Sequence, residues 1–134
     1  MMVETDPPKR ILIVEDDFEN QRFFKLILSR YYDVEFCDCD KSFYSKLASS
    51  EFDLIIMDIT LREGKSGTQL TKEIKGSKVF SSIPVLALSA HVFEQDKRAA
   101  LKAGVDEYLE KPVSNKILLD AIQRLLNKSK LSKV

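Results

Sequence analysis

Two groups of acidic residues follow apolar runs and are placed to do chemistry together. Asp58 closes the run 54–57, and Glu15 with Asp16 follows the run 11–14. Uninterrupted apolar runs rich in isoleucine are typical of strands buried on both faces. If the two strands are neighbours in a parallel sheet, the three carboxylates meet at its carboxyl edge, where α/β proteins bind ligands. Such a cluster is unfavourable unless a cation or protons neutralise it.

Two more polar residues are expected at the same edge, because each follows a further apolar segment. Ser89 comes directly after the segment 83–88, and Lys111 comes after the shorter segment 107–109. Clustered carboxylates suit Mg²⁺, which takes oxygen ligands, keeps several waters and often binds a phosphate oxygen. A carboxylate can also be a nucleophile toward phosphorus. Mg²⁺, the Lys111 ammonium and the Ser89 hydroxyl could neutralise a phosphoryl group transferred to Asp58.

The elements that position these residues alternate along the chain as five strand–helix units. Strands are expected at 9–14, 34–37, 52–58, 83–88 and 107–109, each followed by a helix. This alternation implies a parallel sheet with right-handed crossovers and helices on both faces. At this length the flavodoxin-like doubly wound α/β fold, with strand order 2-1-3-4-5, fits best. That order places the strands before Glu15 and Asp58 side by side.

Apolar spacing and capping residues set the expected helix boundaries. The first helix should bury residues 23, 24, 27, 28 and 31, and the second should bury residues 43, 44, 47 and 48. The third is expected at about 68–75, and the fourth at about 92–103. The apolar stripe of the fourth helix is thin, so it should be the least firmly held. The predicted N-terminal caps and C-terminal stops are Asp16 or Asp17, Asp40, Ser114, Gly76 and Gly104.

Length and composition limit the functions that the chain can have. Its 134 residues suit one domain, expected at 9–127 with a lead at 1–8 and a tail at 128–134. Lys plus Arg and Asp plus Glu number 21 each, so net charge gives no reason to expect nucleic-acid binding. No apolar run is long enough for a membrane span, and the acidic opening segment is unlike a signal peptide, which favours the cytoplasm. With a single histidine in the chain, Cys37 and Cys39 are expected to be reduced thiols and not metal ligands.

From 9 to about 127 the sequence resembles the receiver domain of bacterial two-component response regulators, including the single-domain chemotaxis-regulator type. The motifs that carry the resemblance are Ile-Val-Glu-Asp-Asp at 13–17, Ile-Met-Asp-Ile-Thr-Leu at 56–61, Gly67, Ala-Leu-Ser-Ala at 87–90, and Tyr108 with Lys111-Pro112. Each motif alone is weak. All of them in this order and at these intervals form a specific signature.

The resemblance implies a role for each residue of the acidic edge. Asp58 would be the phosphoacceptor and Lys111 the lysine that binds the phosphoryl group. Asp16, Asp58 and the backbone carbonyl of Thr60 would bind Mg²⁺ directly, and Glu15 would reach the ion mainly through water. The Lys111–Pro112 peptide bond is expected to be cis, which X-Pro bonds permit at modest cost.

The resemblance also implies a switch and two kinds of protein partner. Ser89 would be the switch hydroxyl and Tyr108 the switch aromatic. The phosphoryl donor would be a phosphohistidine on a histidine kinase or a histidine phosphotransfer protein. This chain has no glycine-rich nucleotide loop with which to make that donor. A downstream protein would bind the surface formed by the helix at 92–103, the strand at 107–109 and the helix that follows Ser114.

Three positions depart from the pattern of the family. Glu15 stands where Asp is commoner, which keeps the charge on a longer stem. The loop between Asp58 and Gly67 is one residue longer than usual and carries Arg62 where proline is frequent. His91, two residues after Ser89, occupies a variable position and is expected at the surface beside the site.

Other functions remain open from the sequence. The chain could be a receiver module of a hybrid histidine kinase or of a longer regulator. A receiver-like interaction module that takes no phosphate should have lost an acidic residue or Lys111, and neither is lost. Haloacid-dehalogenase-type phosphohydrolases also place an aspartate nucleophile after a buried strand. They carry a second acid two residues later, where this chain has Thr60, and they need a cap for which 134 residues leave no room. We therefore expect no enzyme activity beyond phosphorylation and dephosphorylation at Asp58.

Overall fold

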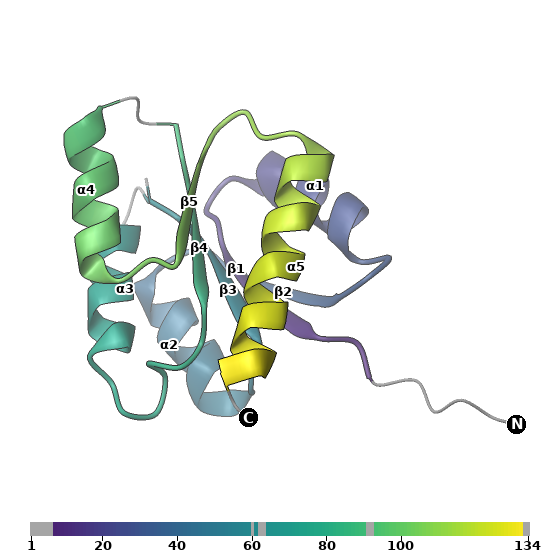
Figure 1. Cartoon of the computed structure of the whole chain (residues 1–134), viewed down its shortest axis with the longest axis horizontal. Coiled ribbons are helices and arrows are strands. Elements are labelled where there is room, and N and C mark those ends of the chain that lie inside the picture. The colour runs from purple at the N-terminus through teal and green to yellow at the C-terminus, as the bar shows by residue number, and fades with distance from the viewer. Residues whose placement is uncertain (1–6, 60, 62–63, 91–92, 133–134) are drawn as a thin grey trace, which may run out of the picture.

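The computed structural model describes residues 7–59, 61, 64–90 and 93–132 (Figure 1). Five strands alternate with five helices, as the sequence predicts. In chain order these elements are β1 (Arg10–Val14), α1 (Phe18–Leu28), β2 (Asp33–Cys37), α2 (Asp40–Ser49), β3 (Leu54–Asp58), α3 (Gly67–Lys75), β4 (Val85–Ser89), α4 (Glu94–Ala103), β5 (Glu107–Glu110) and α5 (Asn115–Ser132).

All strand pairs of the sheet are parallel, and the strand order is β2-β1-β3-β4-β5. This confirms the flavodoxin-like doubly wound fold. Val14 at the end of β1 is in register with Met57, one residue before the end of β3. The residues that follow β1 therefore lie beside Asp58. The order also puts β4 and β5 on the side of β3 away from β1. The carboxyl ends of β1, β3, β4 and β5 therefore lie in a row along one edge of the sheet.

Two apolar cores cover the two faces of the sheet, which accounts for the uninterrupted apolar strands. Alternate residues of each strand point to opposite faces, so Leu12 and Val14 belong to one core and Ile11 and Ile13 to the other. α2, α3 and α4 contribute to the first core, and α1 and α5 to the second. Figure 1 shows the same division, with α1 and α5 on one side of the sheet.

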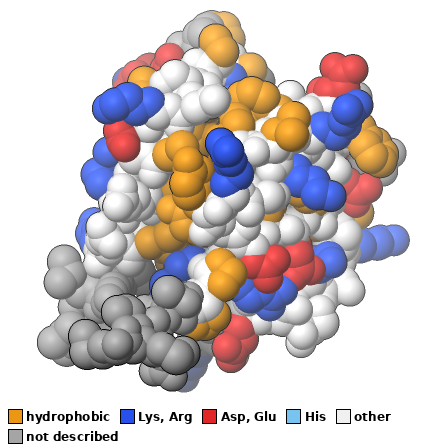
Figure 2. All heavy atoms as spheres, turned by 90° about the vertical axis from the view of Figure 1, so that its right-hand side faces the viewer, with side chains coloured by type: hydrophobic (Ala, Val, Ile, Leu, Met, Phe, Trp, Pro, Cys, Tyr) orange, Lys and Arg blue, Asp and Glu red, His pale blue; other side chains and the backbone are white. Residues whose placement is uncertain are grey.

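The face covered by α1 departs from the expected apolar pattern. Phe24 and Leu28 are buried, but Phe23 is 44% exposed and Tyr31 is 56% exposed. The reason is geometric, because residues one position apart on a helix point about 100° apart, and α1 ends at Leu28 before Tyr31. Figure 2 shows this side of the molecule, with hydrophobic side chains exposed among Lys and Arg. Large hydrophobic residues exposed on the two helices of this face include Phe18, Phe23, Leu26 and Ile117.

Gly76 and Gly104 end α3 and α4 as predicted, and of the three expected N-terminal caps two are confirmed and one is wrong. The Asp17 side chain accepts a hydrogen bond from the Glu19 backbone at 3.0 Å, and Ser114 Oγ accepts one from Ile117 N at 3.2 Å. The N-cap of α2 is Cys39 and not Asp40. Asp40 is the first residue of α2, and its Oδ1 accepts a hydrogen bond from the backbone of the next residue. An acidic side chain there still favours the positive end of the helix dipole.

The last two helices differ in how firmly they are packed. Ala100 is the one buried residue of α4, which confirms its thin apolar stripe, and the expected start of this helix at Val92 lies outside the described residues. α5 buries Leu118, Ala121, Ile122 and Leu125. It continues to Ser132, past residue 127, where the tail was expected to begin. The domain boundary remains a prediction.

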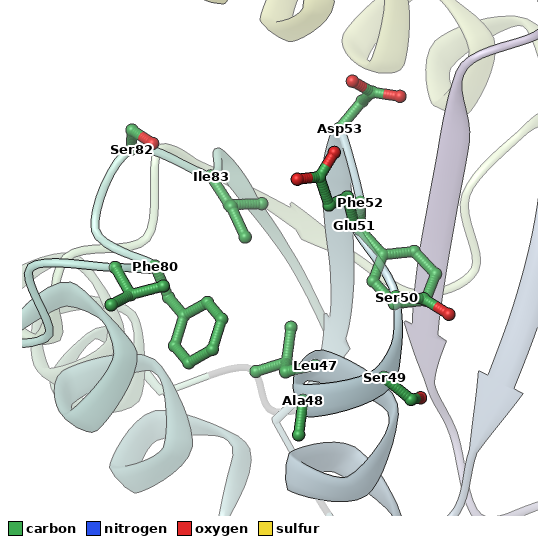
Figure 3. A pocket seen from close by; sticks show the side chains of 11 residues that line it. Leu47, Ala48, Ser49, Ser50, Glu51, Phe52, Asp53, Phe80, Ser82 and Ile83 are labelled. Carbon is green, nitrogen blue, oxygen red and sulfur yellow. The ribbon is translucent and has the colours of Figure 1, made fainter.

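Ion pairs and a pocket occupy the amino edge of the sheet, opposite the acidic residues. Lys75 Nζ lies 2.9 Å from Asp106 Oδ2, and the same oxygen accepts a hydrogen bond from Val85 N at 2.8 Å. The pocket measures about 600 Å³ and lies between the end of α2 and the segment before β4 (Figure 3). Leu47, Phe52, Phe80 and Ile83 supply its apolar lining.

The described part of the chain also bears on the cysteines and on the length of apolar helices. Cys37 and Cys39 are free thiols, and burial raises the pKa of Cys37 to about 12, so its thiol stays protonated. Among the described residues, no helix is both long and apolar enough to span a membrane.

Candidate functional site

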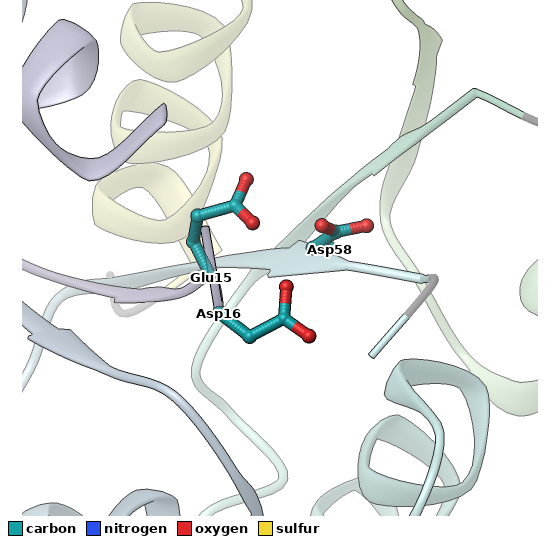
Figure 4. A group of neighbouring side chains, drawn as sticks. All are labelled: Glu15, Asp16 and Asp58. Carbon is teal, nitrogen blue, oxygen red and sulfur yellow. The ribbon is translucent and has the colours of Figure 1, made fainter. Parts of the chain in front are cut away.

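The three predicted carboxylates meet at the carboxyl edge of the sheet. Each of Glu15, Asp16 and Asp58 offers an oxygen, and these oxygens all lie within 4.8 Å of one another. Figure 4 shows the three side chains converging from the ends of β1 and β3. Glu15 and Asp58 are 1% and 7% exposed, whereas Asp16 is half-buried. A cluster of oxygen ligands this compact could hold a metal ion.

Lys111 is the cation that reaches into this cluster. Its Nζ lies 3.4 Å from Glu15 Oε1 and 3.4 Å from Asp58 Oδ2. The backbone fixes where the side chain starts, because Lys111 N donates a hydrogen bond to Ser89 O at 2.8 Å just beyond β5. The next peptide bond, Lys111–Pro112, is cis, as predicted. One ammonium thus faces two buried carboxylates.

One lysine does not fully compensate the carboxylates, and Glu15 shows the consequence. Burial, and after it the negative charge of Asp58, raise the pKa of Glu15 to about 7. The backbone N–H of Asp17, which donates to Glu15 Oε2 at 3.2 Å, and the charge of Lys111 act in the opposite direction. A divalent cation would relieve this excess of negative charge.

Gly67 lets α3 begin directly against the strand that carries Asp58. A Cβ atom at Gly67 would lie 2.3 Å from the backbone oxygen of Asp58 and 3.0 Å from Ile59 Cα. Both neighbours are backbone atoms, so no side-chain rotation could relieve the overlap. Ser66 caps the helix by accepting a hydrogen bond from Gln69 N. The glycine at position 67 is therefore required for close packing beside Asp58.

Ser89 and Tyr108 flank the acidic cluster on β4 and β5. Ser89 is fully buried and is the last residue of β4, next to Asp58 on β3 through the pair Asp58–Leu88. Tyr108 is paired with Ala87 and packs against the core that includes α3 and α4. Its hydroxyl oxygen is buried, with no hydrogen-bond partner among the described residues. The structure therefore shows Tyr108 turned inward.

Three predicted or noted residues cannot be placed. Thr60, Arg62 and His91 lie outside the described residues. The expected metal contact of the Thr60 carbonyl and the surface position of His91 thus remain predictions.

The structure also brings together residues that sequence analysis did not single out. Gln21 Nε2 donates a hydrogen bond to the backbone oxygen of Glu15 at 2.6 Å, which ties α1 to the acidic segment. Lys65, Glu73 and Tyr44 form a separate cluster beside the loop that follows Asp58. Gln21 lies six residues after Glu15, so the sequence offers at most a weak local hint of their contact. The contact between Tyr44 on α2 and Glu73 on α3 leaves no pattern in the sequence that could have predicted it.

A family model described as the response regulator receiver domain matches residues 11–123. Hybrid signal transduction histidine kinase I of Dictyostelium discoideum is 34% identical over 123 residues, which are 86% of this chain and 7% of that protein. The phosphate regulon transcriptional regulatory protein PhoB of Escherichia coli K12 is 34% identical over 122 residues, 90% of this chain and 52% of that protein. The chain thus spans at most about half the length of these relatives.

Solved structures with the same fold agree with this assignment. A CheY-like response regulator receiver domain protein of Methanospirillum hungatei JF-1 has a TM-score of 0.86 at 28% identity, covering 94% of this chain and 99% of that one. The receiver domain of sensor histidine kinase PA1611 from Pseudomonas aeruginosa PAO1 has a TM-score of 0.81 at 29% identity, covering 90% and 99%. That structure has a magnesium ion coordinated in its active-site cleft. The present chain belongs to the response regulator receiver domain family.

Proposed function

We propose that this chain accepts a phosphoryl group on Asp58 from a phosphohistidine of a histidine kinase or a histidine phosphotransfer protein. The observation that carries the proposal is the position of Lys111 Nζ, 3.4 Å from a carboxylate oxygen of Asp58 at the edge where Glu15 and Asp16 converge. Relatives that are histidine kinases and response regulators support this class of partner.

The residues at the carboxyl edge of the sheet would have different roles in phosphoryl transfer. An Asp58 oxygen would attack phosphorus, the phosphorus–nitrogen bond of the donor would break, and the donor imidazole would leave with its electron pair. Lys111, whose Nζ lies 3.4 Å from Asp58 Oδ2, would neutralise the phosphoryl oxygens, and the hydroxyl of Ser89, at the end of the neighbouring strand β4, would orient them. Burial of Asp58 would limit the access of water to the product.

The acidic cluster suits Mg²⁺ as cofactor. Asp16 and Asp58 would bind it together with the carbonyl of Thr60, and Glu15 would act mainly through water. Once bound, Mg²⁺ supplies positive charge for the phosphoryl oxygens. Two observations support this fit. Each of the three carboxylates offers an oxygen, and these oxygens lie within 4.8 Å of one another. Burial and the charge of Asp58 raise the pKa of Glu15, and a bound cation would offset both.

Phosphorylation of Asp58 would change the surface that a downstream protein binds. It adds about 1.5 to 2 negative charges beside Ser89, whose hydroxyl would move toward it. Tyr108 and the loosely packed α4 lie on the same flank of the sheet, so we propose the α4–β5–α5 surface as the one that a downstream protein binds. Exposed apolar residues of α1, such as Phe18 beside the acidic segment, would suit a protein donor.

Receiver domains are generally phosphoaccepting switches and not enzymes. We propose that this one catalyses only its own phosphorylation and dephosphorylation, and that it acts in the cytoplasm. The chain matches only part of the length of each relative, which is compatible both with a stand-alone receiver and with a module of a longer protein.

Incubation with acetyl phosphate and Mg²⁺ tests the acceptor. Intact-mass analysis should show one added phosphoryl group that hydroxylamine removes, as an acyl phosphate requires, and Asp58→Asn should show none. Asp120→Asn on α5 is the control, because that exposed carboxylate pairs with Lys116 far from the site, and it should be phosphorylated as the wild type is. The same adduct on Asp58→Asn would contradict the proposal.

A further inference from the structure

The peptide bond between Glu15 and Asp16 is held by a side chain of α1. Gln21 lies near the start of this helix, and its Nε2 donates a hydrogen bond to the backbone oxygen of Glu15 at 2.6 Å. The backbone of Gln21 is itself fixed, because its N–H donates to Asp17 O at 3.0 Å. Helical side chains lean toward the N-terminus of their helix, which explains how Gln21 reaches a residue that precedes α1.

The hydrogen bond of Gln21 links a packed helix to the acidic segment and is not a helix cap. The cap of α1 is the Asp17 side chain, which accepts a hydrogen bond from Glu19 N at 3.0 Å. Phe24 and Leu28 are buried and hold α1 against the sheet. The half-buried side chain of Gln21 therefore transmits the position of this helix to the backbone between two of the predicted metal ligands.

The convergence of the carboxylates makes this peptide bond important. Successive side chains of a strand point to opposite faces of the sheet, so a strand that continued past β1 would separate Glu15 from Asp16. Both carboxylates instead have an oxygen within 4.8 Å of each other and of an oxygen of Asp58 (Figure 4). Glu15 N still pairs with the sheet, since it donates to Cys37 O at 2.9 Å. The chain therefore leaves the strand at the peptide bond whose oxygen Gln21 holds.

We propose that Gln21 is a positioning residue that directs the Asp16 carboxylate and thereby sets the preference of the site for Mg²⁺ over Ca²⁺. A peptide bond is planar, so holding the Glu15 oxygen fixes the plane from which Asp16 continues. Mg²⁺ demands nearly octahedral ligands at about 2.0–2.1 Å, whereas Ca²⁺ accepts longer and more flexible coordination. Loosening the Asp16 carboxylate should therefore weaken the binding of Mg²⁺ more than that of Ca²⁺. This inference rests on the proposed metal site.

The first variant is Gln21→Met, which removes the donor and keeps an unbranched, uncharged side chain of similar length. Two-dimensional NMR titrations with MgCl₂ and with CaCl₂ measure both affinities in the folded protein, without phosphate. We expect the Mg²⁺ affinity to fall by about tenfold and the Ca²⁺ affinity by no more than about twofold. Gln123→Met is the matched control, because Gln123 is an exposed glutamine of α5, and it should leave both affinities unchanged.

Gln21→Asn is the second variant, because it keeps the amide on a side chain that is one methylene shorter. It should lose the same hydrogen bond and the same preference for Mg²⁺. A general loss of stability would lower the free energy of unfolding without changing the ratio of the two affinities in the folded protein. A ratio equal to that of Gln123→Met, in either variant, would show that Gln21 does not position Asp16.

The outcomes for the wild type separate this inference from the proposed function. A wild type that binds no Mg²⁺ would contradict the proposed cofactor and the role of Gln21 together. A wild type that binds Mg²⁺ but takes no phosphoryl group from acetyl phosphate would contradict the role of Asp58 as acceptor. The titrations of the Gln21 variants would still decide whether Gln21 sets the preference for Mg²⁺.

Discussion

At the scale of single residues, Glu15 is a buried carboxyl group whose pKa is raised. Its folded-state pKa of about 7 lies above the ordinary value of 4.5, mainly because of burial and then because of Asp58. The folded protein therefore holds a proton that the unfolded chain releases between pH 4.5 and 7. Stability linked to this group is fully present below pH 4.5 and is lost as the pH rises through 7.

This linkage gives a prediction for the protein without divalent cations. Urea unfolding at pH 5, 6, 7 and 8 should show the free energy of unfolding falling with pH, by no more than about 3 kcal/mol from this group. Glu15→Gln should flatten the profile, because the amide does not titrate. Excess Mg²⁺ should also flatten it. A wild-type profile with the same pH dependence as that of Glu15→Gln would contradict the raised pKa of Glu15.

Gly67 offers a second prediction at the same scale. Gly67→Ala would place a methyl group 2.3 Å from the Asp58 carbonyl oxygen, so β3 and α3 must separate. The free energy of unfolding should fall by about 2–4 kcal/mol, measured by urea denaturation. Gly76→Ala is the control, since the nearest atom to its added Cβ is 3.5 Å away and its backbone is helical. That change should be neutral or stabilising by up to about 1 kcal/mol. Equal effects of the two changes would contradict this explanation.

The residues of the acidic edge could be predicted because each follows the end of a strand. Asp58 and Glu15 each come directly after an apolar run that predicts a buried strand. A parallel sheet brings the residues at such strand ends together. Lys65 and Tyr44 could not be found in this way. Tyr44 and Glu73 are 29 positions apart on two helices, and no pattern along the chain records which helix faces are neighbours.

At the scale of elements, α4 should open more readily than α5. One residue of α4 is buried, whereas α5 packs an apolar face that includes Leu118 and Ile122 against β-strands of the second core. Hydrogen–deuterium exchange followed by mass spectrometry should show earlier exchange in peptides from 94–103 than in peptides from 115–125, because few packed side chains oppose local opening. Slower exchange in α4 would contradict the expectation that this helix is the least firmly held.

The elements themselves were predictable, and their ends less so. Apolar periodicity found all ten helices and strands because each buries one stripe or two faces. The cap of α2 was assigned to Asp40 and is Cys39, a thiol that capping preferences do not favour. The Ser42 side chain supplies the compensating contact by accepting a hydrogen bond from Cys39 N at 3.2 Å. A side chain three residues further along thus supports this boundary, and the preference of the cap residue alone does not predict it.

At the scale of the whole molecule, the amino edge of the sheet carries stabilising contacts that lie at the opposite end of the strands from the acidic residues. Asp106 accepts hydrogen bonds from Lys75 and from the backbone of Val85 at the amino edge. Asp106→Asn should lower the free energy of unfolding by about 1–2 kcal/mol, because the ion pair is lost and the Val85 N–H keeps a weaker acceptor. Acetyl phosphate should still label Asp58 at the wild-type rate. Loss of labelling in a folded variant would show that the two edges are coupled.

The pocket at the amino edge gives this molecule a natural place for an optical reporter. The sequence contains no tryptophan, so Phe80→Trp would create a single indole emitter at the wall of the pocket. Five residues of β4 separate that wall from the acidic edge, a distance of about 15 Å at the rise of a strand. An emitter so placed touches none of the three carboxylates of the acidic edge and is too far away to disturb a cation bound there. Its spectrum would report on folding in a chain whose chemistry is left intact, so that titrations at the acidic edge could be corrected for unfolding in the same cuvette.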